Sequence, residues 1–152
     1  MTKTLLCAII IMLACSVVPA QDKGFGIGVI AGDPTGISVK QWLGPVAALD
    51  GAAAWSLIEE PGHPILHLHA DFLLHAYPFN VTAGKLPLYF GVGGRVRVHD
   101  NLEVGARVPV GVAWLMPIFP LDVFFELAPT MNVFPATRFQ LNGGIGIRYF
   151  FE

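Results

Sequence analysis

The sequence predicts an all-β fold, an eight-stranded antiparallel up-and-down transmembrane β-barrel with a polar, plugged lumen. Eight consecutive runs alternate apolar and polar residues, which is the period of a strand with two unlike faces. Turn signals rich in Gly and Pro separate these runs. Only 13% of the residues are charged and 54% are hydrophobic, which is too little charge to cover the surface of a small soluble domain.

The N-terminal segment has the features of a secretory signal peptide. Lys3 precedes a long apolar run, and Val18-Pro19-Ala20 resembles a cleavage site. The run is shorter than the ~20 residues that a membrane-spanning helix needs. We therefore expect residues 1–20 to be removed and residues 21–152 to form the barrel; a lipid anchor on Cys15 is the alternative. The mature chain has no disulfide in this interpretation, because the signal peptide contains both cysteines, Cys7 and Cys15.

The expected strands follow one another with short connections. They cover residues 24–31, 37–43, 47–57, 65–77, 88–98, 102–115, 121–134 and 139–152. Several contain 11 to 14 residues, and a tilted strand needs roughly 9–11 to cross a bilayer. Pro109 and Pro129 each remove a donor from the hydrogen-bond ladder, so we expect a bulge or local unpairing at both.

Within each run, alternate residues lie on the same face of the strand, so the odd and even positions (their parity) indicate which face points inward. In the run 102–115 one face carries Glu103 and Arg107 among small residues, whereas the other is a row of branched residues that leads to Trp114. The other runs repeat this division. Faces that mix small residues with charges are suited to a crowded interior, and uninterrupted apolar rows are suited to contact with lipid. A transmembrane barrel has this arrangement, with polar residues inside and apolar residues outside. A soluble barrel would have an apolar lumen and a polar exterior.

The inward faces predict a lumen filled by ion pairs. Charges of both signs compensate one another in a narrow barrel, and eight strands leave an interior that side chains fill. We therefore expect no open pore. The residues assigned to this network are Lys40, Asp50, His67, His69, Asp71, His75, Arg95, Arg97, Glu103, Arg107, Asp122, Glu126 and Arg148.

The row of histidines raises the question of a metal site. His67 and His69 project to one side of a strand, together with Asp71 and His75. This spacing can supply two imidazoles to zinc or copper. Pairing with the Arg and Glu side chains of neighbouring strands is the interpretation that we favour. The sequence therefore predicts neither a metal nor a cofactor.

No motif points to catalysis or to nucleic-acid binding. Ser38 and Ser56 are the only serines after the signal peptide, and neither lies in a nucleophile motif. The glycine-rich stretches GFGIG and GGIGIR superficially resemble dinucleotide loops, but no helix follows either of them. A net charge of -2 gives no basic surface for nucleic acid. We expect a protein without enzymatic activity.

Aromatic residues near the ends of the runs fit the two girdles that membrane barrels place at the lipid–water interfaces. The residues assigned to these girdles are Trp42, Trp55, Tyr89, Trp114, Tyr149 and Phe151.

The ending GIGIRYFFE alternates apolar residues up to a final aromatic, with Ile147, Tyr149 and Phe151 in the alternating positions. With the eight runs, this ending resembles small outer-membrane barrels of the OmpA-transmembrane-domain and OmpX kind. The stretches GKLPLYFGVGGRVRV, ARVPVGVAWL, PLDVFFELAPTMNVFPAT and LNGGIGIRYFF are similar to a family of short-loop, largely uncharacterised outer-membrane barrels. The resemblance covers nearly the whole mature chain. It implies a barrel in outer-membrane lipid whose C-terminal strand is recognised by the barrel assembly machinery. We expect this barrel to be a monomer.

The leading functional interpretation is an outer-membrane barrel with a structural or interaction role in the bacterial envelope. Its short turns argue against a large adhesive surface, since binding usually relies on loops. A small-solute channel is one alternative. A periplasmic carrier with a lipocalin-like barrel is another, and it requires an apolar lumen and solubility without detergent.

Overall fold

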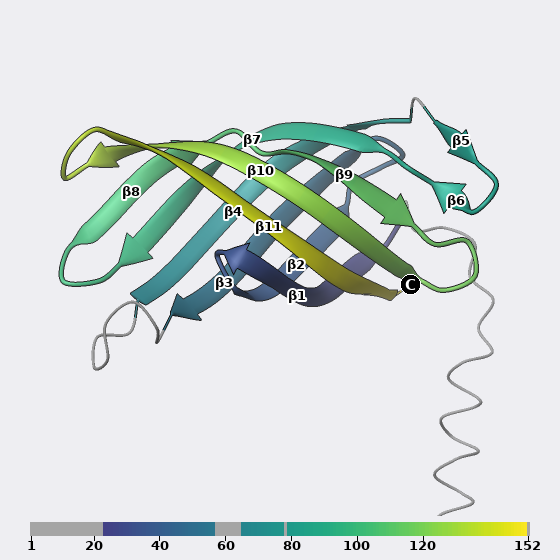
Figure 1. The fold of residues 1–152 in the computed structure, drawn as a ribbon, viewed down its shortest axis with the longest axis horizontal. Coiled ribbons are helices and arrows are strands. Elements are labelled where there is room, and N and C mark those ends of the chain that lie inside the picture. Colours follow the sequence, from purple (N-terminus) through teal and green to yellow (C-terminus); the bar gives the residue numbers. More distant parts are fainter. Residues whose placement is uncertain (1–22, 57–64, 78, 152) are drawn as a thin grey trace, which may run out of the picture.

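The computed structural model describes residues 23–56, 65–77 and 79–151. The expected signal peptide, with its two cysteines, lies outside these residues. The described chain forms one sheet of antiparallel strands that curls into a barrel (Figure 1). In these three segments no helix is long and apolar enough to span a membrane.

The barrel wall consists of eight strands, as predicted, when the two halves of an interrupted strand are counted as one. Those halves are β8 and β9, which both lie between β7 and β10. Pairing of β1 with β11 closes the ring. The strands are β1 (Phe25–Asp33), β2 (Gly36–Trp42), β3 (Ala47–Ser56), β4 (Ile65–Ala76), β5 (Asn80–Val81), β6 (Gly84–Lys85), β7 (Leu88–Val98), β8 (Leu102–Arg107), β9 (Val110–Leu115), β10 (Leu121–Phe134) and β11 (Arg138–Phe151).

The predicted strand ends agree with the structure to within two residues, except that the predicted ends at 57 and 152 lie outside the described residues. The irregularity expected at Pro109 separates β8 from β9. At Pro129 the β10–β11 ladder is continuous, but the pairing of β10 with its other neighbour stops at Leu127 and resumes at Thr130. Local unpairing is thus confirmed at Pro109, whereas Pro129 stays within β10 and its carbonyl accepts from Val108 N at 2.9 Å. The hairpin of β5 and β6 was not foreseen, because the sequence indicated only a connection there.

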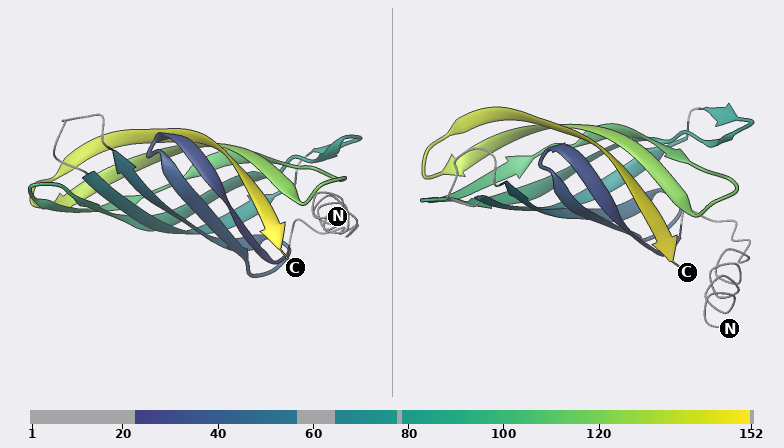
Figure 2. Two further views of the ribbon diagram at one scale, coloured as in Figure 1. Left: turned by 90° about the horizontal axis from the view of Figure 1, so that it is seen from below. Right: turned by 60° about the horizontal axis from the view of Figure 1, so that its bottom comes forward.

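The register of the strands sets their tilt, and their small number keeps the lumen narrow. Starting at Asn132, successive partners around the wall are Gly105, Arg95, His69, Ala52, Ser38, Gly28, Arg148 and Asp122. The path returns to β10 ten residues from its start, from Asn132 to Asp122. This stagger requires strongly tilted strands, which Figure 2 shows. The interior of such an eight-stranded barrel is about wide enough for side chains to fill.

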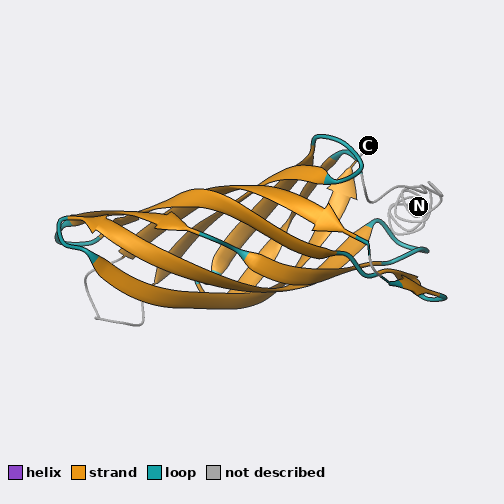
Figure 3. Ribbon diagram, turned by 90° about the horizontal axis from the view of Figure 1, so that it is seen from above, coloured by secondary structure: helices purple, strands orange, loops and turns teal. Residues whose placement is uncertain are grey.

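The two ends of the barrel carry different connections. At the end that we call the tail end, β1 begins and β11 finishes, and the β5–β6 hairpin projects beyond the wall (Figures 1 and 3). The opposite end, the head end, carries the turns from β1 to β2, β7 to β8 and β10 to β11. The β1–β2 turn stops short there, because β1 pairs with β11 only from Gly143 onward.

The barrel has a charged interior and an apolar exterior. The largest fully buried side chains include Arg95, Arg107, Arg148 and Lys40. On the outer face, Val92 is 63% exposed and Ile145 is 56% exposed. Folded soluble proteins place lysine and arginine outside, almost never fully buried unless paired. The observed faces therefore match the parity assignment made from the sequence.

Candidate functional site: the ion-paired lumen

The structure places the predicted network residues on the inner face of the barrel. Arg97 and Glu103 are half-buried register partners near the head end. The remaining members are buried: Lys40, Asp50, His67, His69, Asp71, His75, Arg95, Arg107, Asp122, Glu126 and Arg148.

Arg148, on β11, bridges the lumen in its tail-end half. Its guanidinium donates to Asp50 Oδ2 on β3 at 2.6 Å and to Asp122 Oδ2 on β10 at 3.4 Å. Its Nε donates to Ser38 Oγ at 2.9 Å, and its Cζ lies 3.8 Å from the centre of the Phe124 ring. Because β1 and β2 separate β11 from β3 in the wall, the pair of Arg148 and Asp50 crosses the interior.

Lys40 occupies an aromatic cage near the tail end. Its Nζ lies 2.9 Å from His75 Nε2, 4.4 Å from the centre of the Trp42 ring and 5.5 Å from that of Tyr89. Cations are attracted to the faces of aromatic rings within about 6 Å. The Tyr89 hydroxyl in turn donates to Glu126 Oε2 at 3.0 Å. The cage therefore links the lysine to the carboxylates deeper in the lumen.

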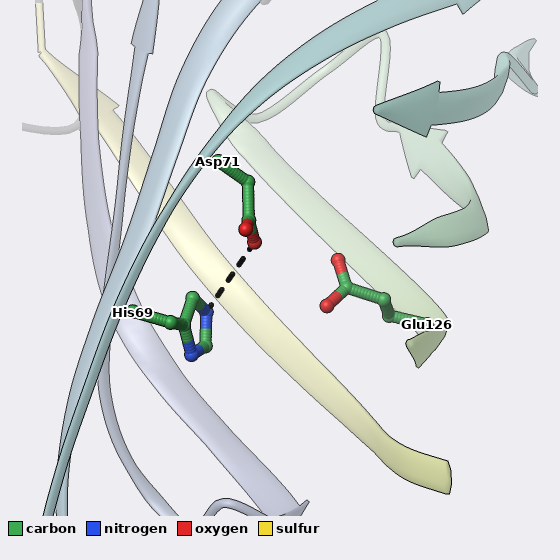
Figure 4. A group of neighbouring side chains, drawn as sticks. All are labelled: His69, Asp71 and Glu126. Atoms are coloured by element: carbon green, nitrogen blue, oxygen red, sulfur yellow. Dashed lines mark ion pairs between the residues drawn. The ribbon is translucent and has the colours of Figure 1, made fainter. Parts of the chain in front are cut away.

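A second bridge runs through the middle of the barrel. Arg107, on β8, pairs with Glu126 on β10 and places its Nε 3.1 Å from Asp71 Oδ2 on β4. His69 Nε2 lies 3.8 Å from the same Asp71 oxygen. Figure 4 shows His69 and Asp71 extending from one strand while Glu126 faces them from another. With Arg148, this bridge obstructs the lumen at two places.

The buried Arg95 is held by amides rather than by carboxylates. Its guanidinium donates to Asn142 Oδ1 at 2.9 Å, to Asn132 Oδ1 at 2.5 Å and to Gln140 Oε1 at 2.6 Å. The side-chain nitrogen of Asn142 donates in turn to Asp33 Oδ2, and that of Asn132 donates to Glu103 Oε2. These amides, together with Ser38 and Thr130, were missing from the predicted network. Their inward parity was the signal that could have identified them.

Two of the aromatics assigned to the interface girdles lie inside the barrel instead. Trp42 is 4% exposed and Tyr89 is 3% exposed, so the assignment was wrong for both. They share the parity of the lumen residues of their strands and pack with Phe124, Phe150 and other apolar side chains. The lumen is therefore partly apolar. The other four aromatics point outward: Trp55, Trp114, Tyr149 and Phe151.

Inward-facing glycines make room for these large lumen residues. A Cβ atom at Gly146 would lie 2.3 Å from the ring of Phe124. A Cβ atom at Gly111 would lie 2.4 Å from Cζ of Tyr89. Real Cβ atoms almost never approach so closely, so these glycines are required by the packing of the plug.

The lumen also contains a group with the composition of a metal site. His69, Asp71 and Glu126 each offer a ligand atom, and these atoms lie within 4.8 Å of one another. Among the described residues, His67 and His75 do not belong to this group. Arg107 contacts both carboxylates, so its guanidinium already supplies the positive charge that a metal would bring.

We therefore expect zinc to bind only when Arg107 is shortened. Added Zn²⁺ should leave the unfolding of the wild-type barrel unchanged. It should stabilise Arg107→Ala by about 2.7 kcal/mol at a hundredfold excess over Kd. Urea unfolding in detergent, followed with and without Zn²⁺, measures this, and Arg95→Ala is the control that should not respond. Equal stabilisation of the wild type would show that Arg107 does not exclude the metal.

Comparison with known proteins supports the fold. No protein-family model and no curated protein matches the chain. Among solved structures, it is similar to the crystal structure of the N-terminal β-barrel domain of Pseudomonas aeruginosa OprF, with a TM-score of 0.57 and 10% sequence identity. The match covers 84% of this chain and 95% of that one. The chain thus has the fold of a small eight-stranded OmpA-like β-barrel, as its sequence predicted.

Proposed function

We propose that the protein is an outer-membrane β-barrel, exported by a signal peptide cleaved after residue 20, with a structural or interaction role and no open pore. The observation that carries this proposal is the closed ring with an apolar exterior and a charged interior. In lipid, closure leaves no unpaired sheet edge, and apolar rows face hydrocarbon at no cost. The shared fold with an OprF barrel domain supports the same location.

The contents of the lumen favour a closed barrel over a channel. Arg107 connects β4 with β10 and Arg148 connects β3 with β10, and neither pair of strands is adjacent in the wall. The charged lumen also disfavours a lipocalin-like carrier, which would hold an apolar ligand. A catalytic role has little support, because the hydroxyl of Ser38 is buried against Arg148.

The proposed partners are outer-membrane lipid and the barrel assembly machinery. Ile147, Tyr149 and Phe151 alternate along β11 and are 41–51% exposed on the outer face. A final strand of this kind can be recognised before it pairs. We propose that the folded barrel is a monomer that uses its wall as an envelope anchor for its short turns.

Fractionation and gel migration test the proposal. The exported protein should be found in the outer-membrane fraction, and the unheated barrel should migrate differently from the boiled chain in detergent gels. In planar bilayers the purified barrel should show no stepwise ion conductance. Recovery from the periplasm without detergent would favour the carrier, and stable conductance steps would favour the channel.

A further inference from the structure

We propose that the closed lumen conducts protons while it excludes other ions and solutes. The inference rests on the proposed membrane location. Side chains that can carry a proton form a chain through the interior, and each is at most 8% exposed. From the tail end toward the head end they are His75, Tyr89, Glu126, Asp71, His69 and His67.

The first links of this chain lie in the tail-end half. The rings of His75 and Tyr89 are 5.4 Å apart between their centres. The Tyr89 hydroxyl donates directly to Glu126 Oε2 at 3.0 Å. Glu126 comes from β10, whereas His75 comes from β4, so the path crosses the lumen at this level.

The remaining links return to β4 and continue along it. A carboxylate oxygen of Glu126 lies within 4.8 Å of the ligand atoms of both Asp71 and His69 (Figure 4). His69 Nε2 is 3.8 Å from Asp71 Oδ2. The rings of His69 and His67 meet edge to face, with their centres 5.7 Å apart. All three β4 side chains share the inward parity, so the strand itself sets their spacing.

Single water molecules can complete the longer links. Two consecutive hydrogen bonds of about 2.8 Å span roughly 5.6 Å. This covers the distances between the polar atoms of Glu126, Asp71 and His69, which are at most 4.8 Å. His67 Nε2, His69 Nδ1 and Asp71 Oδ1 are buried without a hydrogen-bond partner among the described residues. Buried polar atoms normally have partners, and ordered water supplies them where protein does not.

The two ends of the proton path lie near the two ends of the barrel. At the tail end, the ring of Trp42 packs 4.4 Å from that of His75 between their centres. Trp42 also lines a surface cavity of about 260 Å³ together with Leu43 and Pro45. At the other end, His67 is the third residue of β4, which begins at the head end.

The chemistry of these groups permits transfer without any other bond change. An imidazole or a carboxylate accepts a proton on one atom and releases one from another. The Tyr89 hydroxyl oxygen accepts a proton while it releases its own to Glu126. The pH difference across the membrane drives the net movement. Arg107 lies beside Asp71 and Glu126 and repels other cations. A proton differs from other cations because it neutralises the carboxylate that receives it. The buried side chains that fill the lumen block larger ions and solutes.

Proton flux into vesicles tests the proposal. The wild-type barrel is folded into liposomes that contain a pH-sensitive dye, and an external acid step is applied with valinomycin and K⁺ to balance charge. Acidification should be faster than in protein-free liposomes, while a chloride-sensitive dye reports no anion entry. Tyr89→Phe, which removes one hydroxyl, should return the flux to the protein-free rate, and so should His69→Leu. Tyr149→Phe, on the outer face, is the matched control and should keep the wild-type flux.

The outcomes separate this proposal from the proposed function. A heat-modifiable gel shift of the liposome sample shows whether each variant has inserted. Inserted wild-type barrel with only the protein-free flux would overturn the inference and leave the proposed function intact. Flux that persists in inserted Tyr89→Phe and His69→Leu would also overturn it, since protons would then bypass the chain. Failure of the wild type to insert would instead contradict the proposed function.

Discussion

Replacing Arg148 by methionine lowers the free energy of unfolding of the barrel by about 3–5 kcal/mol. The guanidinium lies between Asp50 and Asp122, both buried, and its loss leaves two carboxylates without their cation. Methionine retains most of the apolar volume beside Phe124, so the loss reports mainly the uncompensated charge. Urea titration of the barrel in lipid vesicles, followed by gel migration, measures the change.

The control for this prediction is the same substitution at Arg138. Arg138 is exposed at the head end, where a surface change is usually worth no more than about 0.5 kcal/mol. Removing both carboxylates as well, in Arg148→Met with Asp50→Asn and Asp122→Asn, should recover part of the lost stability. If Arg148→Met and Arg138→Met unfold at the same urea concentration, the bridge across the lumen contributes nothing.

Replacing Val110 by arginine should prevent stable folding into a bilayer, at a cost of about 2–4 kcal/mol. Val110 is 43% exposed on the outer face and lies near the middle of the wall, beside Leu127 and Phe90. In the proposed membrane location an arginine there would face hydrocarbon at the greatest depth. The folded fraction in vesicles, measured by gel migration after dilution from urea, gives the effect.

Depth provides the matched control. Val98 is 40% exposed on the same outer surface but ends β7 at the head end. The cost of arginine falls to about 0–1 kcal/mol near the interface, so Val98→Arg should fold nearly as well as the wild type. Equal folding of Val110→Arg and Val98→Arg would mean that the outer face does not contact lipid.

The fold could be predicted because alternation is a local property of the sequence. Each strand shows its two faces within a few residues, so β7 and β10 could be delimited to the residue. The interruption at Pro109 was foreseen for the same reason, since a missing donor is visible in the sequence. The β5–β6 hairpin has only two residues in each strand, too few for alternation to be recognised.

The contents of the lumen were harder to predict because partners come from distant strands. Parity placed Arg95 inside, but nothing in its own strand indicated that three amides from β10 and β11 would surround it. Trp42 and Tyr89 were assigned by their position near strand ends, whereas their parity pointed inward. The stagger of ten residues determines which side chains of distant strands face one another inside the lumen. It is the sum of the registers of all strand pairs in the ring, so no single strand reveals it.

The bond between Arg148 and Asp50 joins positions 98 residues apart, in the last and the third strand of the wall. A growing polypeptide therefore holds acidic groups whose counterpart has not yet been synthesised. Such distant contacts make assembly slow, and little stability accrues until the final segment arrives. Translation that stops before residue 138 should yield only chains that chaperones hold and proteases remove.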